Sequence, residues 1–288
     1  MYAWPSAPVD AVAAAKERGA TVVVENINTF TGWARTVLDR ASEAIGAPPQ
    51  HTITDQWIEE ELRRLSLADF VFAPNAFVEE SLRQTGITTY EVLPTSYGAY
   101  LPQRPARTLD EPTTGGRRLR FLFVGLVCVR KGAHRLLEAW REARIPGELV
   151  ICGTVDPFVA ERYAEELADP SVHVIGFQPD IDAQYASADV FVFPSLEEGG
   201  PQVCYEAAAH GMPQITTAIG GGRIARDGRN ALVVEPDSAD ALAGALRKLA
   251  ADAELRHELG ITARRDAREF AWPEVAARRH ELLVQAGC

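Results

Sequence analysis

The fold of this chain is indicated most clearly by Pro194-Ser-Leu-Glu-Glu-Gly-Gly-Pro-Gln-Val-Cys-Tyr-Glu206. It follows an apolar run, Asp189-Val-Phe-Val-Phe193, that is typical of a buried parallel strand. Two glycines come next, and Pro201 stands where a helix would have its first residue. The order strand, glycine loop, helix predicts an open α/β sheet with a ligand site at the carboxyl end of the strand. A helix start there offers N–H groups and a positive dipole end to an anion.

Two carboxylates flank this anion site, Glu198 in the loop and Glu206 on the helix. A lone glutamate in either place is more often a solvated surface group. The pair, together with Gly199 and Gly200, favours a binding site instead.

Length and charge narrow the class of protein. The chain has 288 residues and a net charge of −11, which predicts a globular protein of about two domains and argues against a nucleic-acid partner. A local basic pocket for phosphate stays open. No apolar run reaches the length of a membrane span, and the N-terminus resembles no signal peptide, so we expect a cytoplasmic protein.

The four cysteines, Cys128, Cys152, Cys204 and Cys288, are far apart and match no zinc spacing. We expect reduced thiols. Cys204 lies inside the stretch 194–206, where we expect a small buried apolar residue rather than a nucleophile.

Residues 101–117 are rich in Pro and Gly and poor in apolar residues, which predicts a linker. We expect a partial N-terminal domain over residues 1–109 and the linker proper over 110–117. A donor-binding domain follows over 118–270, and a C-terminal helix over 271–288 crosses back to the first domain.

The first half predicts only about three strands, few for a doubly wound domain. Its first recognisable element is a helix, so we expect the front of this domain to be missing or supplied by something else. The expected helices cover 9–18, 30–45, 58–67 and 77–83, and the expected strands 21–24, 70–72 and 90–93.

The second half alternates strands and helices regularly, which predicts a parallel sheet with helices on both faces. The expected strands cover 119–124, 148–152, 172–175, 190–193, 214–217 and 232–234. The expected helices cover 133–143, 159–167, 181–186, 201–210, 239–250, 253–269 and 272–285.

A second candidate anion site opens this half. Phe121-Leu-Phe-Val-Gly125 is followed by Arg130-Lys131-Gly132, again a strand, a glycine turn and a helix start. Arg and Lys both suit a diphosphate, although a solvated helix start explains them equally well. The order of Gly and Lys is not that of a Walker A loop.

The ordered motifs resemble the donor domain of retaining glycosyltransferases of family 4, which have the GT-B fold of two Rossmann-like domains. The resemblance covers almost the whole chain. It is carried by Phe123-Val-Gly…Arg-Lys-Gly132, His173-Val-Ile-Gly-Phe177, Ala188-Asp-Val-Phe-Val-Phe-Pro-Ser195, the pair Glu198…Glu206, Tyr205-Glu-Ala-Ala-Ala-His-Gly-Met-Pro213, and Leu67-Ala-Asp-Phe-Val-Phe-Ala-Pro74 with Tyr97-Gly98.

The resemblance implies an activity: transfer of a sugar from a nucleoside diphosphate sugar to an acceptor, with retention of configuration and without a metal or other cofactor. It implies catalytic roles for Glu198 beside the donor sugar and for Arg130 and Lys131 at the leaving diphosphate. The implied donor-binding residues are Gly125, Gly176, Phe177, Gly199, Gly200, Gln202, Val203 and Glu206, with Glu206 on the ribose and the 176–177 segment near the nucleobase.

Some residues depart from the family pattern. Leu126 stands where many relatives carry an Arg, so the cationic role goes to Arg130. Gly200 stands where relatives often have an aromatic residue. His51 has no matching context, and we do not expect it to be catalytic.

Two other readings stay open beside the enzyme. One is a non-catalytic nucleotide-sugar-binding remnant or partner subunit. Independently of this choice, we expect the chain to self-associate through its incomplete first domain. The other, a dinucleotide oxidoreductase, is disfavoured because Gly220-Gly-Gly222 does not form the G-x-G-x-x-G turn between strand and helix. The acceptor, whether sugar, lipid or small molecule, and any peripheral membrane contact are left open.

Overall fold

The computed structural model describes residues 1–102 and 118–287, so the predicted linker falls almost wholly outside the described residues. The chain divides into two units. Unit 1 contains Met1–Tyr97, Glu197–Gly200 and Trp272–Cys288, and unit 2 contains Gly98–Leu196 and Pro201–Ala271. Among the described residues, no helix combines the length and apolar character that crossing a bilayer requires.

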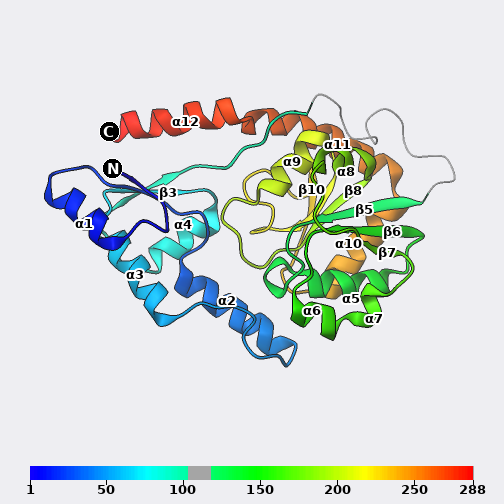
Figure 1. The fold of residues 1–288 in the computed structure, drawn as a ribbon. Helices are drawn as coiled ribbons and strands as arrows, with labels where there is room; N and C mark the ends of the chain where they lie inside the picture. Colours follow the sequence, from blue (N-terminus) through cyan, green and yellow to red (C-terminus); the bar gives the residue numbers. More distant parts are fainter. Residues whose placement is uncertain (103–117, 288) are drawn as a thin grey trace. The chain divides into compact units, whose positions relative to one another are not determined.

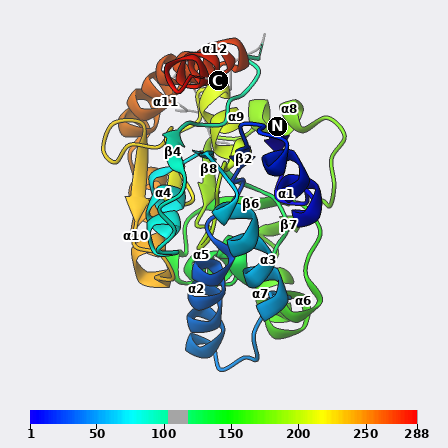
Figure 2. The ribbon, with the colours of Figure 1, turned by 90° about the vertical axis from the view of Figure 1, so that its left-hand side faces the viewer.

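Unit 1 is built on a parallel sheet of four strands in the order β1-β2-β3-β4 (Figure 2). Its elements are β1 (Tyr2–Ala3), α1 (Val9–Glu17), β2 (Val23–Glu25), α2 (Thr31–Ala44), α3 (Asp55–Ser66), β3 (Phe70–Ala73), α4 (Ala76–Arg83), β4 (Glu91–Pro94) and α12 (Trp272–Gln285).

The expectation of three strands with a helix first was wrong, because β1 precedes α1. This strand has two residues, too few for an alternating pattern to appear in the sequence. Its pairing of Tyr2 with Val23 and of Ala3 with Val24 places β2 inside the sheet, so β1 rather than residues 21–24 forms the edge.

Alternation along β2 and β3 directs side chains to two separate cores, because successive residues of a strand point to opposite faces. Val24 and Val71 lie in a core completed by residues of α1, α3 and α4. Val23 and Phe72 face the other way and, with Leu93, pack against Leu282, Leu283 and Ala286 of the α12 segment.

Helix α12 therefore covers one face of the unit 1 sheet. Along this helix Val275 is buried and Leu282 and Leu283 are partly buried, whereas Ala276 is exposed. An ion pair reinforces the packing, since Arg279 bonds the buried carboxylate of Glu25 and its guanidinium lies 4.2 Å from the centre of the Phe72 ring.

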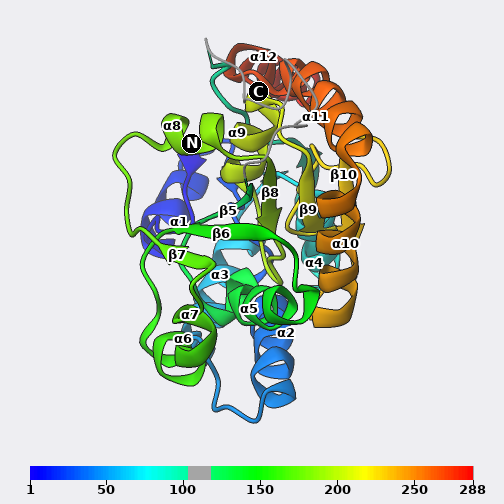
Figure 3. The same ribbon diagram turned by 90° about the vertical axis from the view of Figure 1, so that its right-hand side faces the viewer.

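Unit 2 holds a six-stranded parallel sheet in the order β10-β9-β8-β5-β6-β7 (Figure 3). Its elements are β5 (Leu119–Val124), η2 (Val129–Lys131), α5 (Ala133–Ala143), β6 (Gly147–Cys152), α6 (Pro157–Arg162), α7 (Ala164–Leu167), β7 (Val172–Val174), α8 (Ile181–Ser187), β8 (Val190–Phe193), α9 (Gln202–His210), β9 (Gln214–Thr217), β10 (Ala231–Val234), α10 (Ala239–Ala251), α11 (Ala253–Ala267) and η3 (Arg268–Phe270).

Helices cover both faces of this sheet, with α5, α6, α7 and α10 on one side and α8, α9 and α11 on the other (Figures 1 and 3). The single helix expected over 159–167 is two short helices that meet at Tyr163. The hydroxyl of Tyr163 donates to Glu138 of α5, so a tertiary contact sets the break that local propensity did not show.

Strand order marks a candidate ligand site in unit 2. The chain leaves β5 toward β6 and β7, then returns to β8 on the other side of β5. The order reverses between β5 and β8, and ligands of open α/β sheets bind outside the carboxyl ends of the strands at such a point.

Candidate functional site

The loops that follow β5 and β8 are tied together at this switch point. The carbonyl oxygen of Arg130 accepts hydrogen bonds from the backbone of Leu196 at 2.9 Å and the hydroxyl of Ser195 at 3.1 Å. Gly132 has φ of 66°, and a Cβ there would overlap the carbonyl of Pro194. Glycine is therefore required both by the left-handed conformation and by the close approach of the two loops.

The two predicted cations, Arg130 and Lys131, lie where these two loops meet. Arg130 and Lys131 belong to the 3₁₀ turn η2, and α5 begins at the expected residue, Ala133. The ammonium of Lys131 lies 5.3 Å from the centre of the Phe193 ring, over the last residue of β8. Both cations are thus partly buried at the carboxyl edge of the sheet, where they are less screened than surface charges.

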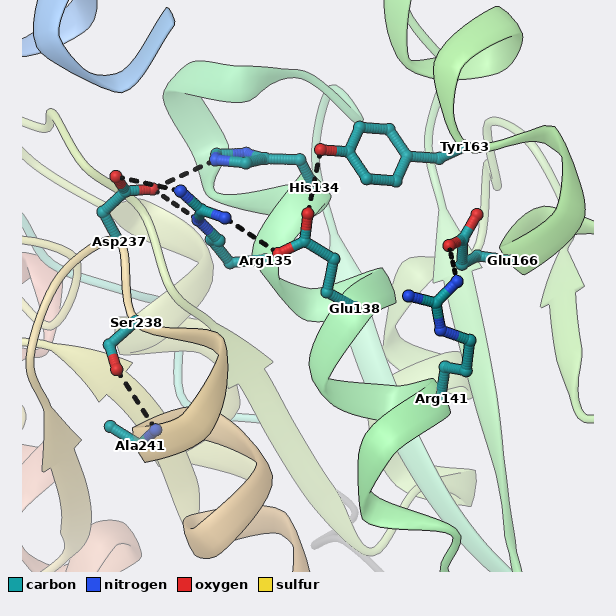
Figure 4. A network of polar contacts seen from close by, with 9 residues as sticks. All are labelled: His134, Arg135, Glu138, Arg141, Tyr163, Glu166, Asp237, Ser238 and Ala241. Carbon is teal, nitrogen blue, oxygen red and sulfur yellow. Dashed lines mark hydrogen bonds and ion pairs between the residues drawn. The ribbon is translucent and has the colours of Figure 1, made fainter. Parts of the chain in front are cut away.

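A polar network fixes the helix that follows these cations (Figure 4). His134 is fully buried and bonds Asp237 at 3.1 Å, and Arg135 donates to the same carboxylate at 2.7 Å. Burial opposes ionisation of Asp237, but the bonds from His134 and Arg135 outweigh it and lower the pKa of this carboxyl. The start of α5 is therefore anchored to the segment between β10 and α10.

The start of α9 faces the same edge of the sheet. Pro201 is the N-cap rather than the first helical residue, so Gln202 and Val203 lead the helix with first-turn N–H groups that lack intrahelical acceptors. Two hydroxyls at the end of β9 bond the end of β8 and the residues after it, since Thr217 donates to the carbonyl of Ser195 at 2.5 Å and Thr216 to that of Phe193 at 2.7 Å.

The glycine run Gly220-Gly-Gly222 lies in the turn that follows β9, and the next helix, α10, begins only at Ala239. The glycine run therefore follows a strand but does not open a helix.

Glu206 lies one turn into α9 and is held by a buried tyrosine. The hydroxyl of Tyr185 donates to the Glu206 carboxylate at 2.9 Å, and the Tyr185 ring stacks on His210 at 5.0 Å between centres. Burial raises the pKa of Glu206, more than the hydrogen bond from Tyr185 lowers it. The carboxylate is thus oriented and only partly exposed, which suits an acceptor of ligand hydroxyls better than a solvated surface acid.

Three further predicted donor-binding residues lie at the same edge of the unit 2 sheet. Gly125 ends β5 with φ of 142°, which favours glycine. Gly176, with φ of 68°, and Phe177 follow β7 on the far edge strand. The Phe177 side chain is 83% exposed, so its ring offers an open stacking surface.

The remaining predicted residues, Glu198, Gly199 and Gly200, belong to unit 1. Glu198 is 5% exposed. A Cβ at Gly199 would overlap the carbonyl of Ile27, and one at Gly200 would overlap the Tyr97 ring. The glycines are required here by neighbouring protein groups, a reason that differs from the expected approach of a sugar diphosphate.

Unit 1 also has a pocket of about 650 Å³ at the carboxyl ends of β1 and β2. It is lined by residues 5–10, residues 26–29 with Thr31, and Trp57, Glu60, Glu61, Arg63 and Arg64 of α3. Trp57 is 50% exposed, and Glu61 accepts a hydrogen bond from the backbone of Thr31 at 2.8 Å. Burial raises the pKa of the Glu61 carboxyl.

Other reactive side chains have structural partners. Cys204 is buried, as expected, and its thiol donates to the Gly220 carbonyl. Cys128 and Cys152 are free thiols whose pKa is raised by burial, that of Cys152 to about 11. His51 bonds Asp39 at 2.9 Å within unit 1.

The sequence contains an Asp-x-Asp, Asp180-Ile-Asp182, at the start of α8. Asp180 caps α8 by accepting from Ala183 at 3.1 Å. Within the described part of the chain, no three His, Cys, Asp or Glu side chains cluster as a metal-ligand set.

Sequence reasoning missed several residues that shape these sites. Tyr185 gave no signal beyond a helical position. Asn75, Thr29 and Tyr97 each contact the Glu197–Gly200 loop across more than a hundred residues of sequence. Of these, only Tyr97 was noted in the sequence, as part of a family motif.

Comparisons with known proteins agree with the fold. Residues 118–252 match the family model described as glycosyl transferases group 1. Among solved structures, the Anabaena protein HepE in complex with UDP has a TM-score of 0.77 and 17% identity, covering 99% of this chain and 78% of that one. A sucrose-phosphate synthase from Thermosynechococcus elongatus has a TM-score of 0.73 and 23% identity, covering 96% of this chain and 77% of that one. The fold is GT-B, with two Rossmann-like units.

Curated relatives are more similar in sequence, over a smaller share of this chain. The D-inositol 3-phosphate glycosyltransferase of Paenarthrobacter aurescens is 32% identical over 179 residues, which are 57% of this chain and 43% of the relative. A probable sucrose-phosphate synthase of Arabidopsis thaliana is 38% identical over 110 residues, 38% of this chain and 10% of the relative. The chain matches less than half the length of these relatives.

Proposed function

We propose that this chain is a glycosyltransferase that moves a sugar from a nucleoside diphosphate sugar to an acceptor, with retention of configuration. One observation carries the proposal. Arg130, Lys131 and the start of α9 meet the carboxyl edge of the unit 2 sheet at its topological switch point, inside the segment that matches glycosyl transferases group 1.

The proposed chemistry follows from these charges. The departing nucleoside diphosphate gains negative charge as the glycosidic bond breaks, and donors fixed in advance near that charge stabilise the transition state. Arg130, Lys131 and the leading N–H groups of α9 supply this stabilisation. The acceptor then attacks on the face that the phosphate leaves, with the phosphate rather than a protein nucleophile assisting. Neither metal nor cofactor takes part, so a chelator leaves the rate unchanged.

The donor contacts are assigned by chemistry. Glu206, oriented by Tyr185, accepts from the ribose hydroxyls, and Phe177 with Gly176 lies near the nucleobase. Glu198 contacts hydroxyls of the donor sugar, and Gly125 lets the backbone approach the diphosphate.

The pocket of unit 1 is the proposed seat of the acceptor. Its lining combines a half-exposed indole, Trp57, with carboxylates and amides. An aromatic face with several hydrogen-bonding groups suits a small polyhydroxylated molecule. The acceptor assignment rests on the lining of this pocket alone.

The test begins with calorimetry on the purified chain, using uridine, guanosine and adenosine diphosphates in turn. We expect at least one to bind, and the matching nucleotide sugar to be consumed when acceptors are supplied. NMR of the product reports the anomeric configuration, and parallel reactions with a chelator report the need for metal. No binding of any of the three at millimolar concentration contradicts the proposal.

A further inference from the structure

The loop Glu197–Gly200 is held by three residues, Asn75, Thr29 and Tyr97, of which Thr29 also lines the pocket proposed for the acceptor. All lie in unit 1 together with the loop. They come from the ends of three different strands of the unit 1 sheet or the segments that follow them, β3, β2 and β4.

Asn75 does two things with one amide group. Its oxygen caps α4, accepting from Phe77 at 2.7 Å and Val78 at 2.9 Å. Its nitrogen donates to the carbonyl oxygens of Glu198 at 3.1 Å and Gly199 at 2.5 Å. The side chain is 1% exposed, so these bonds do not compete with water.

Thr29 fixes the other end of the loop. Its backbone N–H and its hydroxyl both donate to the same oxygen of Glu197, at 3.1 Å and 2.7 Å. Both residues are buried, which makes this pair of bonds to a carboxylate stronger than a surface contact. The Glu197 carboxylate is therefore held by Thr29. The sugar contact is proposed for the neighbouring acid, Glu198.

Tyr97 closes the third side. Its ring occupies the space that a side chain at Gly200 would fill, because a Cβ built there would overlap the ring atoms nearest the Tyr97 backbone. That part of a tyrosine cannot swing away as the tip of a long side chain can. Burial raises the pKa of Tyr97 to about 12, so the ring is neutral at working pH.

We propose that Asn75, Thr29 and Tyr97 are positioning residues that set the backbone of the Glu197–Gly200 loop and thereby the place of Glu198 beside the donor sugar. The inference rests on the proposed function, because it assigns these residues to the sugar half of the donor. It assigns to side chains of unit 1 the placement of the acid for which the sugar contact is proposed.

The test uses variants that leave the helix cap intact. Asn75→Ser keeps a capping oxygen for α4 but lacks the amide donor. Thr29→Val keeps shape and the backbone N–H but removes the hydroxyl. Asp252→Ser, at the N-cap of α11, is the matched control for a serine cap elsewhere.

We expect Asn75→Ser and Thr29→Val to lower kcat by about 5- to 30-fold, the effect of losing one or two hydrogen bonds. Affinity for the free nucleoside diphosphate should stay within about twofold of the wild type, because the groups that bind it are untouched. The ratio of the affinity for the nucleotide sugar to that for the free nucleoside diphosphate should fall. The control should match the wild type in all three.

Two results overturn the inference while leaving the proposed function intact. One is a wild-type kcat in both variants. The other is a loss of free-nucleotide affinity in step with kcat, which indicates a general structural role. Failure of the wild type to bind any nucleotide refutes the proposed function instead.

If Asn75→Ser does not fold, a second pair of variants tests whether Tyr97 positions the loop. Gly200→Ala should lower kcat by placing a methyl group against the Tyr97 ring, and adding Tyr97→Ala should restore part of the loss by making room. A double variant no better than Gly200→Ala excludes the packing of Tyr97 on Gly200 as a positioning contact.

Discussion

Replacing Glu206 by Gln tests the ribose contact most directly. The carboxylate accepts from Tyr185 at 2.9 Å, and an amide oxygen in the same place can accept the same bond. The substitution therefore keeps the shape of the site and the partner of the buried tyrosine. What it removes is the negative charge that strengthens hydrogen bonds from ligand hydroxyls.

The expected loss can be worked from that charge. A hydrogen bond to a charged group contributes about 1.5–3 kcal/mol, so affinity for the nucleoside diphosphate should fall about ten- to a hundredfold. Folding stability at pH 7 should not fall. Because burial raises the pKa of Glu206, ionising it costs stability as pH rises above the unfolded value of about 4.3, and Gln removes this cost.

Calorimetry at several pH values provides the measurement. Wild-type affinity should weaken on acidification, starting above the pH at which an ordinary glutamate is protonated, because the charged form binds and its pKa is raised. The Glu206→Gln variant should lack this pH dependence. Glu258→Gln, an exposed change on α11, serves as the matched control. Wild-type affinity in Glu206→Gln, or an unchanged acid limb, would refute the ribose assignment.

Three further predictions follow from the charges and the pocket. Arg130→Ala or Lys131→Ala should weaken nucleoside diphosphate binding far more than nucleoside binding by calorimetry, and equal losses would show no diphosphate contact. Burial raises the pKa of Glu61, so its ionised form destabilises the fold as pH rises above about 4. Urea unfolding should therefore show that the stability gain of Glu61→Gln over the wild type grows with pH, and a gain independent of pH contradicts this explanation. Trp57→Ala should raise the acceptor KM severalfold with the donor KM unchanged, as steady-state kinetics will show.

The fold of unit 2 could be predicted from sequence because its strands are buried on both faces. Runs such as 121–124 and Val190–Phe193 are continuously apolar, and that pattern is visible without any knowledge of partners. β1 could not be predicted, because two residues carry no periodicity. The break at Tyr163 escaped for a different reason, since a bond to Glu138 on another helix decides it.

The candidate site divides in the same way. Arg130, Lys131 and the start of α9 stand next to strand ends in the sequence, so local order was enough to propose them. Asn75 and Thr29 contact the loop from 124 and 168 residues away, and nothing in their immediate neighbourhood reports those contacts. Only a folded chain brings a helix cap and a loop carbonyl together.

The bond between Arg279 and Glu25 spans 254 residues, and it has a consequence for synthesis on the ribosome. The sheet of unit 1 emerges first, but the helix that covers Val23, Phe72 and Leu93 emerges last. Unit 2 can complete its core while unit 1 still exposes an apolar face and the buried-to-be carboxylate of Glu25. The strands of unit 1 are thus translated before unit 2 but reach their native surroundings only once the helix over 272–285 has emerged from the ribosome.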